Sequence, residues 1–521
     1  PIVPKNLVVV VGFVDLIGKK FDGTPDIQNS LAVIQDGIVV GKYSKILLAN
    51  GGHHDDKHYF TPGQHSPVIN VNVRGQQVKL GTVICEDTWD MDHERNIVRE
   101  AVHNGAQVIV ALNQSYFYYG KQEKRRNMYH KHALQNRVPV ISVNSIGVGD
   151  IGKDFMIYDG GSIVVDKVGD IIAEAARFQP DFKIVDLNAE KNFERSTSLT
   201  KCEEIYEALV FATKHIFYDI GLKRGQVHVS GGIDSSVVLP IVVEALGKEN
   251  VIAISNPSGW NGDVTKANAQ ILCDSLDLKL FWNRIDEVEK SFIKSHVETF
   301  GEASIKPLVV STFDAVGRTV QGLAAAHSFG TGIIATGNHT ELVLGWSNFH
   351  DIGSIGVMSL IGDLTKVEVF ELARYINKRF DKVIIPKNLY DGSTAPAAEL
   401  ADANEDPWIY YVDSGICAEL IREMKDITEL VDEYKNHKLN PDFFPKDPNG
   451  KDVYSLVNAE EFKERVRICF ERSKFSVFKT AQSAPIVLIS PISRGFSSRE
   501  TIINKYAGHY EFEPAKQYTA V

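Results

Sequence analysis

Residues 226–246 read QVHVSGGIDSSVVLPIVVEAL, a β-branched apolar run followed by a glycine pair and a long apolar stretch with the Ala and Leu content of a helix. This order predicts a strand, a tight turn and a helix. Gly231 and Gly232 let the backbone turn with unrestricted φ and let a ligand approach closely. Because the free N–H groups at a helix start attract anions, the stretch predicts a phosphate site.

The same turn carries three hydroxyl groups and one carboxylate. Ser230, Ser235 and Ser236 lie near the expected helix start, where hydroxyls bind phosphate or cap the helix. Asp234 would repel phosphate unless a cation lay between the two, so we predict that it binds Mg²⁺. A turn in which serine and aspartate act only as caps is the alternative.

The full string SGGIDSS, residues 230–236, resembles the signature of the ATP pyrophosphatases, which split ATP into AMP and pyrophosphate while adenylating a substrate. It differs from the GxxxxGK[ST] loop of kinases and GTPases. Four later stretches resemble NAD synthetase motifs in the right order, at residues 253–258, 336–341, 349–366 and 396–406. GMP-synthetase-like or asparagine-synthetase-like enzymes are the alternatives with this loop, but they lack the TGNHTE of residues 336–341.

This resemblance implies roles for individual residues. It assigns deamido-NAD to Arg318 and Asp351, and Mg²⁺ to Asp234 together with Glu341. The residues implied in ATP binding are Ser230, Gly231, Gly232, Asp234, Ser235, Ser236, Ser258, Thr336 and Lys366.

Strands and helices alternate on both sides of the phosphate turn. Apolar runs at 226–229, 250–255, 279–282 and 331–335 predict strands, and helical patterns separate them. This alternation predicts a Rossmann-like, doubly wound parallel sheet whose ligand binds at the carboxyl ends of the strands.

Short apolar runs with helical patterns between some of them recur in the first third of the chain, and they predict a separate α/β domain rich in strands. The apolar run 78–84 ends at Cys85, which is followed by acidic residues. A single cysteine is often a small buried hydrophobe, but a strand-to-helix turn suits an exposed nucleophile, which needs a base and a cation nearby.

The string GTVICEDTWD, residues 81–90, resembles the nucleophile segment of the nitrilase-like amidases, in particular the glutamine-hydrolysing domain of glutamine-dependent NAD synthetases. The resemblance implies a nitrilase-like α-β-β-α sandwich in which the Cys85 thiolate attacks the glutamine amide. Lys45 would stabilise the oxyanion. Glu86, Ser115 and Lys121 match positions that hold glutamine.

Some positions depart from these families. The catalytic Glu of the amidases lies in a segment that would precede Pro1, so we expect either an N-terminal truncation or an impaired glutaminase. Gly51 and His54 stand where a Tyr and a Phe usually line the glutamine pocket. Ala49 replaces a Pro, and Ala397 replaces a Ser or Thr that faces phosphate.

Length and composition describe a globular protein of two or three domains, with 521 residues, 44% hydrophobic and 24% charged. A net charge of −11 does not indicate the basic surface with which proteins bind nucleic acid. Five scattered cysteines without a CxxC argue against zinc and favour a reducing compartment. No apolar run is long enough for a membrane span and no signal peptide is evident, so we expect a cytoplasmic protein.

We therefore predict a nitrilase-like domain at 1–180, a linker at 181–200, an NAD synthetase domain at 201–480 and a tail at 481–521. The predicted function is glutamine-dependent amidation of deamido-NAD with ATP and Mg²⁺, in a homo-oligomer as the family implies. One alternative is an ammonia-dependent synthetase with an inactive glutaminase. Another is a non-catalytic homologue that serves as a binding or regulatory subunit.

Overall fold

The computed structural model describes residues 7–51, 54–187, 198–346, 351–393 and 406–491, and the statements below concern these ranges. It divides into two compact units. Unit 1 comprises Pro1–Gly149 and Ile157–Leu199, and unit 2 comprises Asp150–Met156 and Thr200–Val521. The predicted domain boundaries stay predictions, because residues 188–197 of the expected linker and 492–521 of the expected tail lie outside the described residues.

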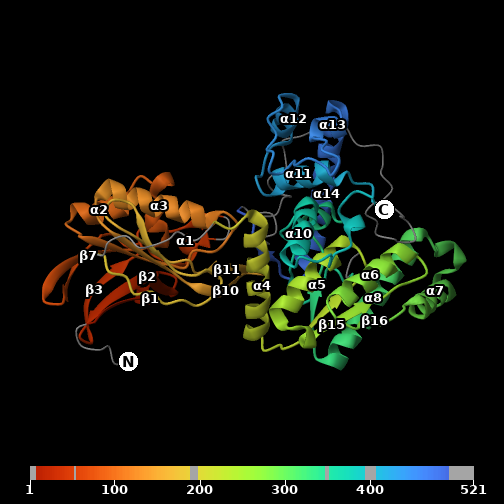
Figure 1. Cartoon of the computed structure of the whole chain (residues 1–521), viewed down its shortest axis with the longest axis horizontal. Coiled ribbons are helices and arrows are strands. Elements are labelled where there is room, and N and C mark those ends of the chain that lie inside the picture. The colour runs from red at the N-terminus through yellow and green to blue at the C-terminus, as the bar shows by residue number, and fades with distance from the viewer. Residues whose placement is uncertain (1–6, 52–53, 188–197, 347–350, 394–405, 492–521) are drawn as a thin grey trace. The chain divides into compact units, whose positions relative to one another are not determined.

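Unit 1 is built on a six-stranded sheet in the order β13-β12-β9-β8-β7-β6. Strands β7, β8 and β9 are parallel, and the remaining pairs are antiparallel. Helices α2 and α3 pack against the sheet and lie together on one face of it (Figure 1). The bounds of these elements are β6 Val68–Val73, β7 Gln76–Ile84, β8 Val108–Asn113, β9 Val140–Asn144, β12 Ile163–Val165, β13 Ile171–Glu174, α2 Ile97–His103 and α3 Lys121–Asn136.

A second, antiparallel sheet of three strands packs on the first: β1 (Val8–Lys19), β2 (Pro25–Gln35) and β3 (Ile38–Ser44). Its inner side chains Leu31 and Val33 share one core with Ile109 of β8 and Ala101 of α2. The result is a helix–sheet–sheet stack, which agrees with the nitrilase-like architecture that the sequence predicts.

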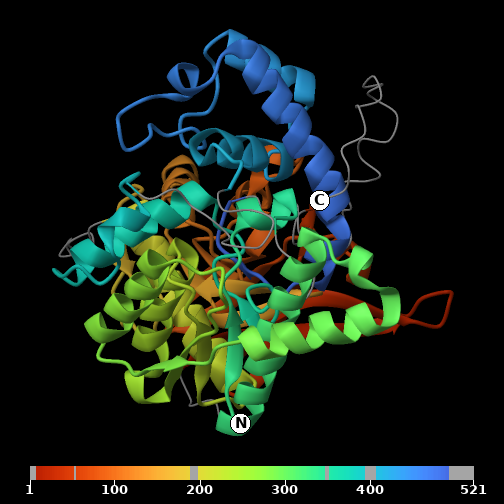
Figure 2. The same ribbon diagram turned by 90° about the vertical axis from the view of Figure 1, so that its right-hand side faces the viewer.

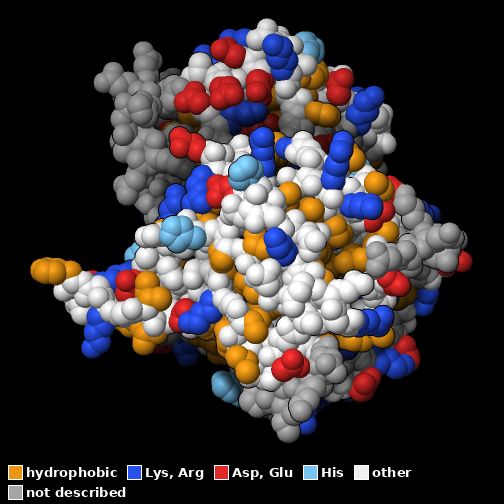
Figure 3. Space-filling view, turned by 90° about the vertical axis from the view of Figure 1, so that its left-hand side faces the viewer, with side chains coloured by type: hydrophobic (Ala, Val, Ile, Leu, Met, Phe, Trp, Pro, Cys, Tyr) orange, Lys and Arg blue, Asp and Glu red, His pale blue; other side chains and the backbone are white. Residues whose placement is uncertain are grey.

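The other face of this second sheet is open to solvent. Val11 and Val39, which the strand register places on this face, are 43% and 52% exposed. The β1–β2 hairpin, red in Figure 2, projects from the sheet. Apolar side chains lie among charged ones on the surface drawn in Figure 3.

Unit 2 is organised around a five-stranded sheet in the order β16-β15-β14-β17-β18, with every pair parallel. The strands are β14 (Gly225–His228), β15 (Val251–Ser255), β16 (Leu280–Trp282), β17 (Gly332–Ala335) and β18 (Met358–Ser359). The strand order reverses at β14, and the crevice outside the carboxyl ends at such a point is where open α/β sheets bind ligands. The parallel sheet that the alternation predicts is confirmed.

Helix α5 (Ile233–Leu246) lies over β14 and β15, and α4 (Lys201–Asp219) and α10 (Lys366–Arg379) pack against it. It is apolar all round because neighbours surround it, and Val237, Leu239 and Val242 are fully buried. Its residues thus form the helix that follows the phosphate turn.

Helix α8 (Pro307–Phe329) packs against β17, and α7 (Asp286–Phe300) packs against α8. In the described part of the chain, no helix is both long and apolar enough to span a bilayer. The remaining elements are β4 Asn50–Gly51, β5 His54–Asp55, α1 Asp56–Tyr59, β10 Ile146–Ile151, β11 Asp154–Asp159, α6 Asp263–Ser275, α9 His339–Leu344, α11 Tyr410–Ile421, α12 Ile427–Lys435, α13 Val453–Leu456, α14 Ala459–Gln482 and β19 Val487–Leu488.

Candidate functional site

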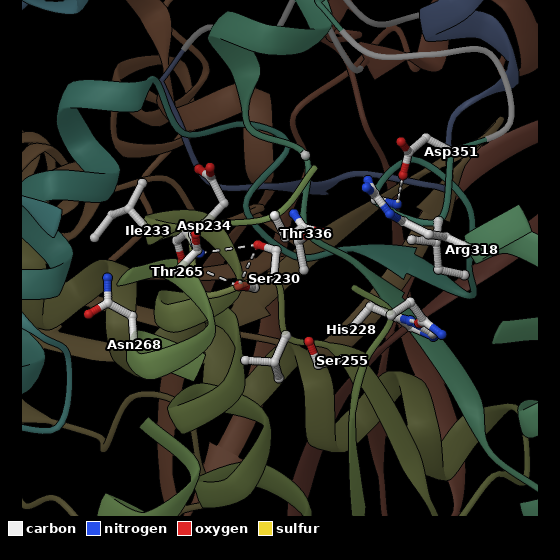
Figure 4. Close-up of a pocket in the computed structure, with 18 of the residues that line it drawn as sticks. His228, Ser230, Ile233, Asp234, Ser255, Thr265, Asn268, Arg318, Thr336 and Asp351 are labelled. Atoms are coloured by element: carbon white, nitrogen blue, oxygen red, sulfur yellow. Dashed lines mark hydrogen bonds between the residues drawn. The ribbon is translucent and has the colours of Figure 1, made fainter. Parts of the chain in front are cut away.

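A cavity of about 300 Å³ opens in unit 2 at the carboxyl ends of β14, β15 and β17 (Figure 4). Ser230 and Asp234 line it from the turn after β14, Ser255 from the end of β15, and Thr336 from the turn after β17. Lys366, the first residue of α10, lines it as well. The cavity therefore lies at the switch point of the sheet, and its size suits a small-molecule ligand.

The turn between β14 and α5 has the geometry of an anion site. Gly231 has φ = +86°, and a Cβ there would come within 1.9 Å of the Thr265 carbonyl oxygen, so only glycine fits. Gly232 is the N-cap of α5, and its N–H donates to Ser230 Oγ at 3.1 Å. The first turn of α5 therefore points its N–H groups toward the cavity where Ser230 stands.

Two carboxylates and one ammonium group meet in the wall of the cavity. Lys366 Nζ donates to Asp234 Oδ2 at 2.6 Å and to Glu341 Oε1 at 2.8 Å. Asn338 Nδ2 donates to the other oxygen, Asp234 Oδ1, at 2.8 Å. Although burial disfavours the charge, Asp234 and Glu341 raise the pKa of Lys366. Burial and the neighbouring Asp234 charge raise the pKa of Glu341 to about 7.

This donor set fits Mg²⁺ in the manner of nucleotide-binding enzymes. Mg²⁺ is usually held by one or two carboxylates together with substrate phosphates. Asp234 and Glu341 supply two carboxylates beside the phosphate turn. Among the described residues no cluster of three or more acidic, His or Cys side chains is placed to hold an ion without a substrate.

Arg318 and Asp351, which the resemblance assigns to deamido-NAD, both line the cavity. The Arg318 guanidinium donates to Asp314, which lies one turn earlier on α8 and is fully buried. Asp351 Oδ1 accepts from the Gly353 N–H at 2.9 Å. Both side chains stand on the same side of the cavity in Figure 4.

Three residues implied in ATP binding do not line the cavity. Ser236 and Ser258 are fully buried, and Ser236 Oγ donates to the Gly232 carbonyl at 2.7 Å. Gly231 is likewise not part of the cavity wall. Its positive φ allows the turn between β14 and α5, and this turn is its contribution to the site. The remaining implied residues, Gly232, Ser235, Thr336 and Lys366 among them, do line it. Ala397 lies outside the described residues.

Two polar residues of the cavity wall, His228 and Asn256, have no role assigned to them by the sequence. His228, at the end of β14, donates from Nδ1 to Asn256 Oδ1 at 2.7 Å. Burial lowers the pKa of His228 to about 4, so the ring is neutral near pH 7. His228 and Asn256 lie side by side because β14 pairs with β15. The sequence predicts the two strands but not the register that brings these residues together.

In unit 1, Cys85 directly follows β7 and begins a single 3₁₀ turn. Its φ of +46° is rare for a residue with a side chain, and such strain often marks a functional position. Burial raises the pKa of the Cys85 thiol, whereas the ammonium groups of Lys45 and Lys121 oppose that rise. The predicted nucleophile and the predicted oxyanion-binding cation therefore share one site.

Lys45 is buried, and its ammonium group contacts the carboxylate of Asp56. Burial disfavours the charge, but Cys85 and Asp56 raise the pKa of Lys45 overall. Asp56 is a site residue that no sequence pattern singles out, because its role arises from the fold of the β4–β5 hairpin beside it.

The residues expected to hold glutamine lie around the same site. Lys121 Nζ lies 3.8 Å from the ring centre of Tyr116 and 4.9 Å from that of Tyr118. Glu86 Oε1 lies 3.0 Å from His93 Nε2. The His54 ring lies 5.1 Å from that of Tyr116, so it packs near the aromatic rings around Lys121.

Ser115 is held at the end of β8 by its backbone. Its N–H donates to Asn144 Oδ1 at 2.9 Å, and its carbonyl accepts from Arg125 at 2.8 Å. Arg125 is in turn paired with the buried Asp159 at 2.8 Å. The strand end that would meet glutamine is therefore fixed by a buried polar network.

Two family models match the chain. The model described as NAD synthase covers residues 206–470, and the model described as carbon-nitrogen hydrolase covers residues 4–191. The first match spans the cavity of unit 2, and the second spans the Cys85 site of unit 1.

Curated proteins and solved structures agree with these matches. The glutamine-dependent NAD(+) synthetase of Synechocystis sp. is 29% identical over 481 residues, which are 89% of this chain and 81% of the relative. That of Thermotoga maritima is 27% identical over 490 residues, 82% of this chain and 81% of the relative. The structure of glutamine-dependent NAD+ synthetase from Acinetobacter baumannii superposes with a TM-score of 0.67 at 26% identity, covering 96% of this chain and 84% of that one.

Proposed function

The chain belongs to the NAD synthase family, and we propose that it converts deamido-NAD, ATP, glutamine and water into NAD, AMP, pyrophosphate and glutamate. The observation that carries this proposal is the cavity of unit 2, where a glycine turn at a helix start faces a Lys366–Asp234–Glu341 cluster. That combination binds phosphate and compensates its charge. The names of the curated relatives and the ADP in the Acinetobacter baumannii complex support the same assignment.

In the synthetase reaction, a carboxylate oxygen of the nicotinate attacks the α-phosphorus of ATP, and pyrophosphate leaves. The N–H groups of the α5 turn and Ser230 bind the phosphates, and Lys366 compensates their charge. Mg²⁺ held by Asp234 and Glu341 would neutralise the phosphates further when bound. Arg318 and Asp351 hold the deamido-NAD. Ammonia then attacks the adenylated carbonyl carbon, and AMP leaves with the carboxylate oxygen.

Adenylation is needed because a free carboxylate is a poor acyl donor. The protein contributes little covalent chemistry to this step and acts mainly by positioning and by electrostatic stabilisation.

In the glutaminase reaction, the Cys85 sulfur attacks the side-chain carbonyl carbon of glutamine and the thiol proton passes to the amide nitrogen. Ammonia then leaves from the tetrahedral intermediate, and a glutamyl thioester on Cys85 remains. Lys45 stabilises the oxyanion, while Glu86, Ser115 and Lys121 hold the glutamine. Water then hydrolyses the thioester to glutamate and frees Cys85.

An isotope experiment tests the adenylation route. Deamido-NAD labelled with ¹⁸O in the nicotinate carboxylate is incubated with ATP, Mg²⁺ and ammonium, and the products are analysed by mass spectrometry. We expect one ¹⁸O atom in AMP and none in pyrophosphate. Label in inorganic phosphate together with ADP would mean attack at the γ-phosphorus and would contradict the proposal.

We further propose that the protein works in the cytoplasm as a homo-oligomer. All five cysteines are free thiols, as a reducing compartment would keep them. Light scattering coupled to size-exclusion chromatography tests the assembly, and a monomer at micromolar concentration would contradict it.

A further inference from the structure

We propose that Asp87 is a positioning residue for glutamine hydrolysis, whose carboxylate holds the chain around Lys45 against the turn that carries Cys85. The inference rests on the proposed function of unit 1. Asp87 is fully buried and lies two residues after Cys85.

One side of the carboxylate binds the segment of Lys45. Asp87 Oδ1 accepts from the N–H groups of Ile46 at 3.1 Å and Leu47 at 2.8 Å, the two residues that follow Lys45. Asp87 Oδ2 accepts from the hydroxyl of Tyr43 at 2.7 Å, two residues before Lys45. The carboxylate thus contacts the chain on both sides of Lys45.

The other contact of the carboxylate fixes the nucleophile turn. Asp87 Oδ2 also accepts from the N–H of Ile84 at 2.9 Å, the residue before Cys85. Thr88 Oγ1 donates to the Cys85 carbonyl at 2.7 Å. A positive φ such as that of Cys85 persists only where the surrounding structure holds it.

A local cap does not account for this arrangement. The bond to Ile84 is local, but the bonds to Tyr43, Ile46 and Leu47 cross 40 to 44 residues of sequence. They join the end of β3 and the segment after it to the 3₁₀ turn that follows β7. Burial raises the pKa of Asp87, whereas the hydrogen bonds from Leu47, Tyr43 and Ile84 and the charge of Lys45 oppose that rise. A buried carboxylate is costly unless it is hydrogen-bonded, and here four donors converge on it.

The substitution Asp87→Asn isolates this role. The amide keeps the shape of the carboxylate and one acceptor oxygen, but its NH₂ group would face donors instead of accepting from them. We therefore expect the Lys45 and Cys85 segments to move apart slightly. A misplacement of about 1 Å costs about 100-fold in rate.

The kinetic signature separates positioning from binding. Ser115 is held by Asn144, and Lys121 lies among aromatic rings, so glutamine binding has its own supports. We expect Asp87→Asn to lower kcat for glutamine hydrolysis about 100-fold and to leave KM for glutamine within about twofold. NAD formation with ammonium, which uses unit 2, should stay at the wild-type rate.

Two further variants complete the experiment. Tyr43→Phe removes one of the four donors and should lower the same kcat several-fold, which keeps the proposal testable if Asp87→Asn does not fold. Asp166→Asn is the matched control, because Asp166 accepts from the N–H groups of Val168 and Asp170 in the turn after β12 and should leave hydrolysis unchanged. Thermal melting reports whether each variant is folded.

A chemical readout separates this inference from the proposed function. Iodoacetamide alkylation of Cys85 at pH 7, followed by peptide mass spectrometry, should be several-fold slower in Asp87→Asn, because a displaced Lys45 no longer stabilises the thiolate. If the wild-type protein uses ammonium but not glutamine, the glutaminase proposal fails and the alkylation rate alone decides on Asp87. Folded Asp87→Asn and Tyr43→Phe proteins with wild-type kcat and wild-type alkylation would overturn the inference.

Discussion

In both units, neighbouring charged groups shift the pKa of a buried lysine. In unit 2, Lys366 stays an ammonium group because two carboxylates contact it. In unit 1, Lys121 has aromatic rings around its amine and the Arg125 guanidinium one turn further along α3. Two lysines of similar burial therefore differ in charge near neutral pH.

The pH dependence of glutamine binding follows from Lys121. Burial first, and then Arg125, lower its pKa to about 7. Below that pH the group is an ammonium that would attract the α-carboxylate of glutamine in the proposed site, and above it the group is neutral. We expect KM for glutamine to rise about tenfold between pH 6 and pH 8 in steady-state assays of glutamate release.

The variant Lys121→Arg serves as the comparison, because arginine keeps its charge over this range. Its KM for glutamine should vary less than about twofold between the same pH values. Equal pH profiles for the two proteins would show that Lys121 does not set the charge of the glutamine site.

At the scale of the element, the first turns of α5, α9 and α10 carry the charged groups Asp234, Glu341 and Lys366 of unit 2. Asn338 is the N-cap of α9, and its Oδ1 accepts from the Glu341 N–H at 3.1 Å. The same side chain donates to Asp234 at 2.8 Å. One residue therefore caps α9 and orients a carboxylate on α5, so the two roles are separable by substitution.

Two substitutions at Asn338 separate the roles. Asn338→Ser keeps a good cap but loses the reach to Asp234, so we expect nearly wild-type thermal stability and about tenfold less ammonium-dependent NAD formation. Asn338→Ala should lose the activity and also about 1 kcal/mol of stability. A fully active Asn338→Ser protein would show that the contact with Asp234 does not matter.

Local patterns in the sequence were enough for much of the fold. The phosphate turn and the parallel strands depend on glycine pairs and apolar runs, and both lie where they were predicted. Helix α7 was not predicted, because its largely exposed surface gives it few apolar positions. Asp56 and Asp87 were not predicted as site residues, because their roles come from contacts 11 to 44 residues away in sequence.

At the scale of the whole molecule, the two chemistries belong to two separate units of one chain. In the proposed function, glutamine hydrolysis uses side chains of unit 1, whereas ATP binds in unit 2 beside Asp234 and Glu341. A treatment that stops one reaction should therefore leave the other measurable.

Removal of Mg²⁺ tests this separation. With excess EDTA we expect NAD and AMP formation from ammonium to fall at least about 100-fold, because the phosphates lose the cation that Asp234 and Glu341 would hold. Added Mg²⁺ should restore it. Glutamate release by the Cys85 site should persist, and undiminished NAD formation in EDTA would contradict the metal assignment.

The most direct test of the account is NAD formation from deamido-NAD and Mg-ATP with glutamine or ammonium as nitrogen donor, for the wild-type protein and Cys85→Ala. We predict that the wild type uses both donors, and that Cys85→Ala uses ammonium at the wild-type rate and glutamine not at all. Wild-type activity with ammonium alone would mean a synthetase with a disabled glutaminase. No NAD with either donor, or glutamine use by Cys85→Ala, would contradict the account.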